Sequence, residues 1–285
     1  MVGSLVEVCS HVEKIMSDRT KIEWADATWN PVTGCSPVSI GCDHCYARAM
    51  AERLKAAGSD AYRNGFEVTT HEQVLDVPLH WQKPRRVFVC SMGDLFHPQI
   101  PVEFIARVFG VMRRCPQHTF LVLTKRAVRM RAITAAGRIS WGTNAWPGVT
   151  VETQAQAHRI VELSEIPAVV RFISAEPLLG DIQLRLREQG VNWVIAGGES
   201  GPGARPMDPQ WVRNLRQDCV DQQVPFFFKQ WGGSNKRDNG RVLDGRTWDE
   251  SPKQPGDIDG RTGRNSDRNT ARQDSQRAGA DSRGV

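Results

Sequence analysis

Short apolar runs alternate with helix-length segments along most of the chain. The runs cover residues 86–90, 119–123, 148–151, 168–173, 192–196 and 224–228, and a further short strand is expected at 27–32. Runs that are apolar throughout, without polar alternation, are typical of parallel strands that are buried on both faces. The pattern therefore predicts seven parallel strands.

The segments between these runs are rich in helix-forming residues. Helices are expected at 46–57, 101–114, 126–136, 154–164, 181–189 and 208–222. The last of them starts with Asp208 as N-cap and Pro209 in the first turn, which is a common helix start. Strands that alternate with helices form a parallel sheet with helices packed outside it. The expected fold class is therefore α/β, with a parallel sheet covered by helices on both faces.

Composition predicts three parts of the chain: a polar leader at 1–20, the barrel domain at 21–250 and a disordered polar tail at 251–285. The tail contains six Arg, one Lys and five Asp. It has almost no large apolar residue, so burial cannot offset its ordering entropy. The chain has no run of about eighteen apolar residues and no secretory signal pattern. We therefore expect a cytoplasmic protein without a membrane span.

Three of the seven cysteines fall in one short loop, Gly34-Cys35-Ser36-Pro37-Val38-Ser39-Ile40-Gly41-Cys42-Asp43-His44-Cys45. Cys42 and Cys45 have the C-x-x-C spacing that brings two thiolates to one metal centre, and six residues separate Cys35 from Cys42. An odd cysteine count with one cluster is unlike a disulfide framework and indicates a reducing compartment.

Two metal centres fit these cysteines. A four-iron cluster held by three thiolates leaves one iron open, whereas a structural zinc needs four protein ligands. His44 is the nearest fourth zinc ligand, but it lies between Cys42 and Cys45, where adjacent side chains rarely reach one metal. The chain has no second C-x-x-C pair. The spacing favours an iron–sulfur cluster and leaves zinc open.

Polar residues follow each predicted strand, where a parallel sheet places its functional site. Glu and Lys are poor helix N-caps, so their presence there favours a site over a chain that merely reaches the surface. Gly197 and Gly198 let a backbone approach a ligand closely, but the loop lacks the Walker and dinucleotide patterns. The residues are Met92, Gly93, Asp94, Lys125, Glu152, Glu176, Gly197, Gly198, Glu199 and Lys229.

The net charge of +5 permits a phosphate-bearing partner without requiring one. A local basic cluster is either the solvated face of a helix or a contact surface for nucleic acid. Its members are Lys125, Arg126, Arg129, Arg131 and Arg138.

The cysteine loop resembles that of radical S-adenosylmethionine (SAM) enzymes, whose pattern is C-x3-C-x-aromatic-C after the first strand of a partial barrel. The first spacing here is six residues instead of three. The resemblance implies a partial (β/α)6-7 barrel of the radical SAM type, with parallel strands inside and helices outside. It implies that Cys35, Cys42 and Cys45 ligate a [4Fe-4S] cluster and that His44 lies near the adenine of SAM. It also implies that the loop of Met92, Gly93 and Asp94 contacts SAM.

Over residues 20–250 the chain more closely resembles the phage-associated three-Cys-motif family of largely uncharacterised proteins. The resemblance rests on TKIEWADATWNPVTGC, GCDHCYA, SMGDLFH, GVTVE, SAEPLLG, GGESG and KQWGG.

Together these resemblances imply an enzyme that cleaves SAM to a 5′-deoxyadenosyl radical and modifies a substrate. A nucleobase, free or in nucleic acid, is one substrate class, and a peptide or small molecule is another. Glu199, with Gly197 and Gly198, would help to hold SAM; Glu152, Glu176, Lys125 and Lys229 are the candidate catalytic residues. A flavodoxin- or ferredoxin-like electron donor is implied as partner. The alternative is a zinc-bound, non-enzymatic nucleic-acid-binding protein.

Overall fold

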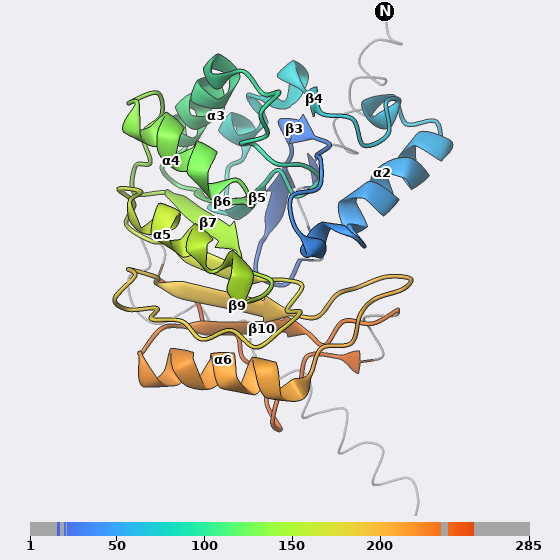
Figure 1. Ribbon diagram of the computed structural model, residues 1–285. Helices are drawn as coiled ribbons and strands as arrows, with labels where there is room; N and C mark the ends of the chain where they lie inside the picture. The colour runs from blue at the N-terminus through green and yellow to red at the C-terminus, as the bar shows by residue number, and fades with distance from the viewer. Residues whose placement is uncertain (1–15, 18–19, 21, 235–238, 254–285) are drawn as a thin grey trace, which may run out of the picture. The chain divides into compact units, whose positions relative to one another are not determined.

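A curled, open sheet is the framework of the computed structural model, which describes residues 16–17, 20, 22–234 and 239–253 (Figure 1). Within these residues the strand order is β1-β2-β5-β6-β7-β8-β9-β10. The seven strands from β2 to β10 are parallel, and β1 is antiparallel to β2. The strands are β1 (Met16–Ser17), β2 (Ala27–Trp29), β5 (Arg86–Val89), β6 (Thr119–Thr124), β7 (Ala145–Thr150), β8 (Phe172–Ala175), β9 (Trp193–Gly197) and β10 (Phe226–Gln230). A separate antiparallel pair is formed by β3 (Val32–Thr33) and β4 (Thr69–Thr70).

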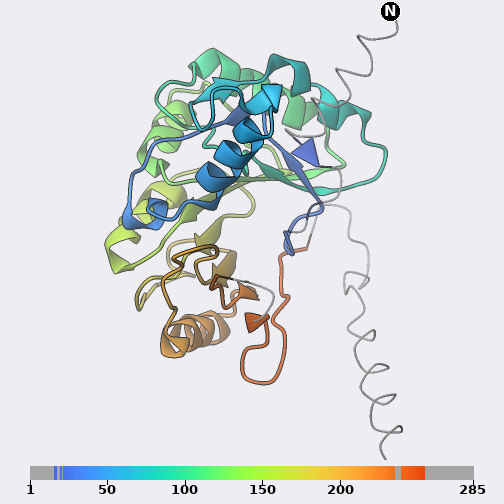
Figure 2. The same cartoon turned by 90° about the vertical axis from the view of Figure 1, so that its right-hand side faces the viewer.

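Helices cover the outer face of the curled sheet, and the concave face is turned away from them (Figures 1 and 2). The α-helices are α2 (Tyr46–Ala56), α3 (Val102–Arg114), α4 (Ala127–Ala135), α5 (His158–Ser164) and α6 (Pro209–Asp221). Short 3-10 helices are η1 (Ile40–Cys42), η2 (Asp60–Tyr62), η3 (Glu72–Val74), η4 (Val77–His80) and η5 (Gln154–Gln156). The predicted α/β partial barrel, with parallel strands inside and helices outside, is confirmed.

The sheet is buried on both faces, which explains why its strands are apolar throughout. In β9, Val194 and Ala196 pack in the large core under the helices, whereas Trp193 and Ile195 pack on the concave face. The concave face is filled at its base by aromatic side chains. Its cluster contains Trp24, Phe88, Leu121, Trp146, Phe172, Trp193, Ile195 and Phe227. These side chains therefore fill the concave face toward the amino ends of the strands.

Gly148 shows how tightly this base is packed. A Cβ atom at Gly148 would lie 2.3 Å from Cζ of Phe172, the residue paired with it on the neighbouring strand. The space that a side chain at residue 148 would need is taken by the Phe172 ring, so glycine is required there.

The helix predicted at 181–189 is wrong. In this segment Ile182, Leu184 and Leu186 are buried while the residues between them are exposed, and the backbone forms no helix. Burial at every second position is the period of an extended chain, so the segment lies along the core with alternate side chains inward. The helix predicted at 208–222 is confirmed as α6, and the side chain of Asp208 accepts a hydrogen bond from the Gln210 N–H at 2.7 Å.

The described residues up to Pro252 belong to one compact unit. The leader predicted at 1–20 and the disordered tail predicted at 251–285 fall mostly outside the described residues, so this division of the chain remains a prediction. Within the described part of the chain, no helix is both long and apolar enough to cross a bilayer.

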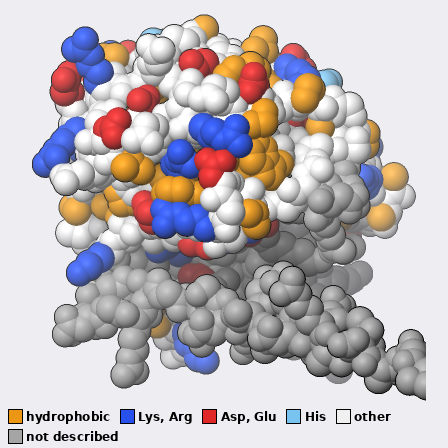
Figure 3. Space-filling view, turned by 90° about the horizontal axis from the view of Figure 1, so that it is seen from below, with side chains coloured by type: hydrophobic (Ala, Val, Ile, Leu, Met, Phe, Trp, Pro, Cys, Tyr) orange, Lys and Arg blue, Asp and Glu red, His pale blue; other side chains and the backbone are white. Residues whose placement is uncertain are grey.

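Most of the predicted basic cluster is paired with acidic residues. Arg131 contacts Glu162 and Glu165, and Arg138 contacts Glu103 at 2.7 Å. On the described part of the face shown in Figure 3, basic and acidic side chains likewise lie interspersed. Arg131 and Arg138 therefore lie in a surface where opposite charges are paired.

Candidate functional site

The cysteine loop lies at the carboxyl rim of the sheet, between the first parallel strand and α2. The chain leaves β2, forms β3 and enters the loop at Gly34, whose N–H donates to the carbonyl of Met92 at 2.9 Å. Gly34 has φ +80° and packs so closely that a Cβ there would lie 2.2 Å from the carbonyl oxygen of Glu67. Glycine is thus needed where the loop begins. Cys35, Cys42 and Cys45 are half-buried free thiols.

Arg126, just after β6, fixes the first part of the loop. Its guanidinium donates to Cys35 Sγ at 3.2 Å and to the carbonyl of Ser36 at 2.9 Å. Asp94, which is 5% exposed, holds the guanidinium from the other side at 2.9 Å. Asp94 is itself fixed by the hydroxyl of Thr124 at 2.8 Å. The ends of β5 and β6 thereby place a positive charge against the first cysteine.

These neighbours also act on the protonation of Cys35. Burial raises the pKa of the Cys35 thiol, and the charge of Asp94 raises it further, while Arg126 opposes both. Because the thiolate is the form that ligates metals, Arg126 favours the ligand form of this cysteine. His97 adds a second contact to this part of the loop, since its Nε2 lies 2.9 Å from Ser36 Oγ.

Glu152, after β7, fixes the middle of the loop. Its side chain is fully buried and accepts a hydrogen bond from Ser39 Oγ at 2.6 Å. Lys125 forms an ion pair with the same carboxylate, and Arg159 donates to it at 2.8 Å. Burial alone would raise the pKa of Glu152, but the two cations lower it below its ordinary value. Gly41 lies so near that a Cβ would be 2.6 Å from this side chain.

Glu199, after β9, fixes the end of the loop. It accepts hydrogen bonds from His44 Nδ1 at 2.8 Å and from the Arg205 guanidinium at 2.6 and 2.9 Å. Arg205 also donates to the carbonyl of Ile40 at 2.8 Å and contacts Asp43 at 3.4 Å. Glu199 and Arg205 thus join the glycine-rich loop that follows β9 to the cysteine loop.

A second glutamate–lysine pair lies at the rim between β8 and β10. Lys229 Nζ is 2.8 Å from Glu176 Oε1, and Ser174 Oγ donates to Glu176 Oε2 at 3.1 Å. Tyr46, which begins α2, donates its hydroxyl to the carbonyl of Ser91 at 2.6 Å.

Two of the predicted glycines, Gly93 and Gly198, allow close packing of the chain. A Cβ at Gly93 would be 2.9 Å from the carbonyl oxygen of Val32, and one at Gly198 would be 2.0 Å from that of Trp231. The Gly198 N–H donates to the carbonyl of Gln230 at 3.0 Å, so it is already engaged. Met92 is buried, and its N–H donates to Asn30 Oδ1 at 3.1 Å.

The sequence interpretation missed the arginines and serines that hold the loop. The two interpretations of the basic cluster place Arg126 on a solvated helix face or on a nucleic-acid contact surface, whereas it precedes α4 and turns toward Cys35. No sequence pattern identifies Arg159 and Arg205 as site residues, because the fold determines which residues they contact. Ser36 and Ser39 had one available signal, which is their position between the cysteines.

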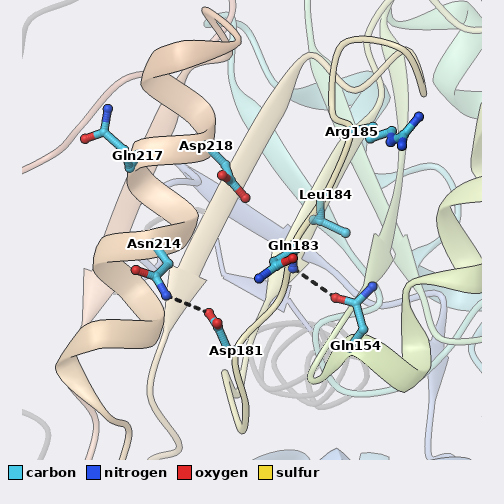
Figure 4. Close-up of a pocket in the computed structure, with 8 residues that line it drawn as sticks. All are labelled: Gln154, Asp181, Gln183, Leu184, Arg185, Asn214, Gln217 and Asp218. Atoms are coloured by element: carbon cyan, nitrogen blue, oxygen red, sulfur yellow. Dashed lines mark hydrogen bonds between the residues drawn. The ribbon is translucent and has the colours of Figure 1, made fainter.

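Two further observations bound the site. Within the described residues, no group of three His, Cys, Asp or Glu side chains converges closely enough to hold a single metal ion. Away from the cysteine loop, a groove of about 810 Å³ lies beside α6 (Figure 4). Its amides are engaged with neighbours: Asn214 donates to Asp181 at 3.0 Å, and Gln154 accepts from the Gln183 N–H at 2.9 Å. None of the cysteines of the loop and none of the acidic residues that anchor it lines this groove.

The fold and site define an α/β partial-barrel protein with a cysteine loop anchored at the carboxyl rim. The chain belongs to the family described as protein of unknown function (DUF5131), whose sequence model matches residues 19–252. Membership of an uncharacterised family is thus confirmed, and the association with phages stays a prediction.

A search of curated proteins found no match. Among solved structures, the chain is similar to "Spore photoproduct lyase complexed with dinucleoside spore photoproduct", with a TM-score of 0.40 and 8% sequence identity. The similarity covers 72% of this chain and 66% of that chain, which is just under two thirds of its length.

Acid should weaken the closure of the glycine-rich loop. Burial opposes ionisation of Glu199, but its bonds to Arg205 and His44 lower its pKa from 4.5 to about 2. A lowered pKa stabilises the folded state above the unfolded value, and this contribution is lost as pH falls from about 5 toward about 2. We expect urea unfolding to show a stability advantage of wild type over Glu199→Gln at pH 7 that shrinks below pH 5. An advantage that is constant across this range would contradict the assignment.

Proposed function

We propose that the protein is a radical SAM-type iron–sulfur enzyme, in which Cys35, Cys42 and Cys45 hold a [4Fe-4S] cluster. The observation that carries the proposal is the cysteine loop itself. It joins the first parallel strand to α2 at the carboxyl rim, and residues after β6, β7 and β9 anchor it through Arg126, Glu152 and Arg205.

The donor set fits such a cluster. Three half-buried free thiols lie in one loop, and three thiolates leave one of four irons open. Each thiolate ligates a different iron, so the thiols need not converge on one point as they would around a single ion. Arg126 donates to Cys35 Sγ, and hydrogen bonds to ligand sulfurs tune cluster potentials. When bound, the cluster would supply the electron that cleaves SAM to a 5′-deoxyadenosyl radical.

The chain's own residues would bind and orient the reactants. We propose that Met92, Gly93 and Asp94 border the SAM site on one side of the cysteine loop. His44 and Glu199, beside Gly197 and Gly198, would border it on the other side. Lys125 and Glu152 are bonded to each other and to the loop, which supports a positioning role for them. We propose that Glu176 and Lys229 contact the substrate.

We propose a nucleobase, free or within nucleic acid, as the substrate, and a phage-associated setting for the reaction. A low-potential electron donor of the flavodoxin or ferredoxin type would be the protein partner. The free thiols support a reducing, cytoplasmic environment.

The test is the metal content of full-length protein purified without oxygen, followed by reduction in the presence of SAM. We expect about four irons with matching sulfide per chain, a brown protein and formation of 5′-deoxyadenosine. One zinc per chain, with no iron after reconstitution and no SAM cleavage, would reject the proposal in favour of the zinc-bound alternative.

A further inference from the structure

The Glu176–Lys229 pair is on the concave side of the sheet. In β8 and β10, Phe172 and Phe227 belong to the concave cluster. Ser174 and Lys229 each follow one of these residues by two positions, so they share its face of the strand. The pair therefore stands above the aromatic base of the half-barrel, at its open end.

Gly197 of β9 makes room for the pair. β9 lies between β8 and β10, so Glu176 must reach across it to meet Lys229. A Cβ at Gly197 would lie 3.0 Å from Glu176 Oε1 and 3.5 Å from Cβ of Lys229. The register of β10 against β9 shifts between Phe228 and Gln230, which places Lys229 at the irregularity. A Cβ atom at residue 197 would therefore displace the Glu176 carboxylate by a few tenths of an ångström.

Solvent reaches both charged groups. The side chains of Lys229 and Glu176 are 19% and 13% exposed, unlike Glu152 at 0%. An ammonium has three donors and a carboxylate about four acceptor positions. The contacts with each other and with Ser174 use only part of this capacity. The pair can thus bind a ligand with one donor group and one acceptor group side by side.

The charge of the pair selects the ligand. Glu176 already neutralises Lys229, so a lone phosphate or carboxylate would meet an anion at the site and be disfavoured. A neutral group that offers a carbonyl to Lys229 and an adjacent N–H to Glu176 satisfies both partners. This arrangement is the lactam edge, which uracil, thymine and guanine carry and adenine lacks.

We propose that Glu176 and Lys229 recognise the lactam edge of the substrate nucleobase. The inference rests on the proposed function, because it assigns the substrate class of the same rim. Lys229 binds the carbonyl oxygen, Glu176 accepts the ring N–H, and Ser174 holds the carboxylate in place.

The experiment measures binding of uridine, 3-methyluridine and adenosine to the full-length, reconstituted protein with SAM, by calorimetry. The methyl group removes the N–H and leaves the carbonyls. We expect uridine to bind at least tenfold more tightly than either comparison ligand. Lys229→Met should weaken uridine binding at least tenfold, and Glu176→Ala should abolish the preference over 3-methyluridine. Lys55→Met, on the exposed side of α2, is the control and should leave uridine affinity unchanged.

An oligothymidylate arm identifies the source of the base. We compare the affinity of an oligothymidylate with that of the same oligonucleotide carrying N3-methylated thymines. If the unmethylated oligonucleotide binds although uridine does not, and methylation lowers its affinity, the protein recognises the lactam edge within nucleic acid. Equal affinity for uridine and 3-methyluridine, with no discrimination between the two oligonucleotides, would overturn the inference. The ligand comparison uses wild-type protein, so it remains decisive even if a variant fails to fold. Repeating it on protein without iron separates the two proposals, because lactam selectivity there would survive a failure of the radical chemistry.

Discussion

Replacing Cys42 by alanine is expected to remove the iron and to reduce 5′-deoxyadenosine formation to background. Three thiolates are the smallest protein set that holds a four-iron cluster with one open iron. Two thiolates would leave a second iron without a protein ligand. Iron should fall from about four per chain to less than about one, together with the visible absorption.

The fold should survive this substitution. Cys42 is half-buried at the end of η1, and its Sγ is only within 4.0 Å of Ser39 Oγ. Far-ultraviolet circular dichroism and the melting temperature of iron-free protein should therefore match those of wild type. Cys219→Ala is the matched control, because Cys219 is fully buried in α6 and lies outside the loop. Full iron content in the Cys42 variant, or equal loss in the Cys219 variant, would remove Cys42 from the ligand set.

The strands were predictable because a strand buried on both faces leaves an unbroken apolar run. That condition holds from β5 to β10, and alternate residues in each strand face the two cores. The segment at 181–189 misled the prediction, since its alternating Ile182, Leu184 and Leu186 lie in a stretch of otherwise helix-forming residues. Its burial comes from packing beside α6, where Gln222 Nε2 donates to the carbonyl of Leu184 at 2.9 Å. Tertiary contact outweighed local propensity there.

The site was predictable only as a set of positions. Strand ends identify which residues reach the rim, and the parallel order makes those ends adjacent. Which charges meet there depends on the register and curl of the sheet. Glu176 and Lys229 pair across an intervening strand because Gly197 has no side chain, and Arg205 closes on the cysteine loop over 165 positions to Ile40. No local pattern carries information of that range.

Glu152→Gln should be the most destabilising single change at the rim. Wild-type Glu152 is fully buried against Lys125 and Arg159, which are themselves 21% and 6% exposed. Glutamine keeps the size of the side chain but leaves two cations without their carboxylate. Removing one partner from a buried ion pair costs about 3–5 kcal/mol, far more than the pair adds relative to an apolar replacement. Urea unfolding at pH 7 should show a loss of this size.

The same substitution should loosen the cysteine loop, because Ser39 is anchored to Glu152 three residues before Cys42. Ser39→Ala separates the two effects. It removes one hydrogen bond to a charged group, worth about 1.5 kcal/mol, so stability should fall less than in Glu152→Gln while iron retention against a chelator falls. Glu103→Gln is the matched control, since Glu103 forms an exposed pair with Arg138 and should alter neither quantity. If Glu152→Gln unfolds at the same urea concentration as Glu103→Gln, the carboxylate does not anchor the rim. The loop would then be held by Arg126 and Arg205 alone.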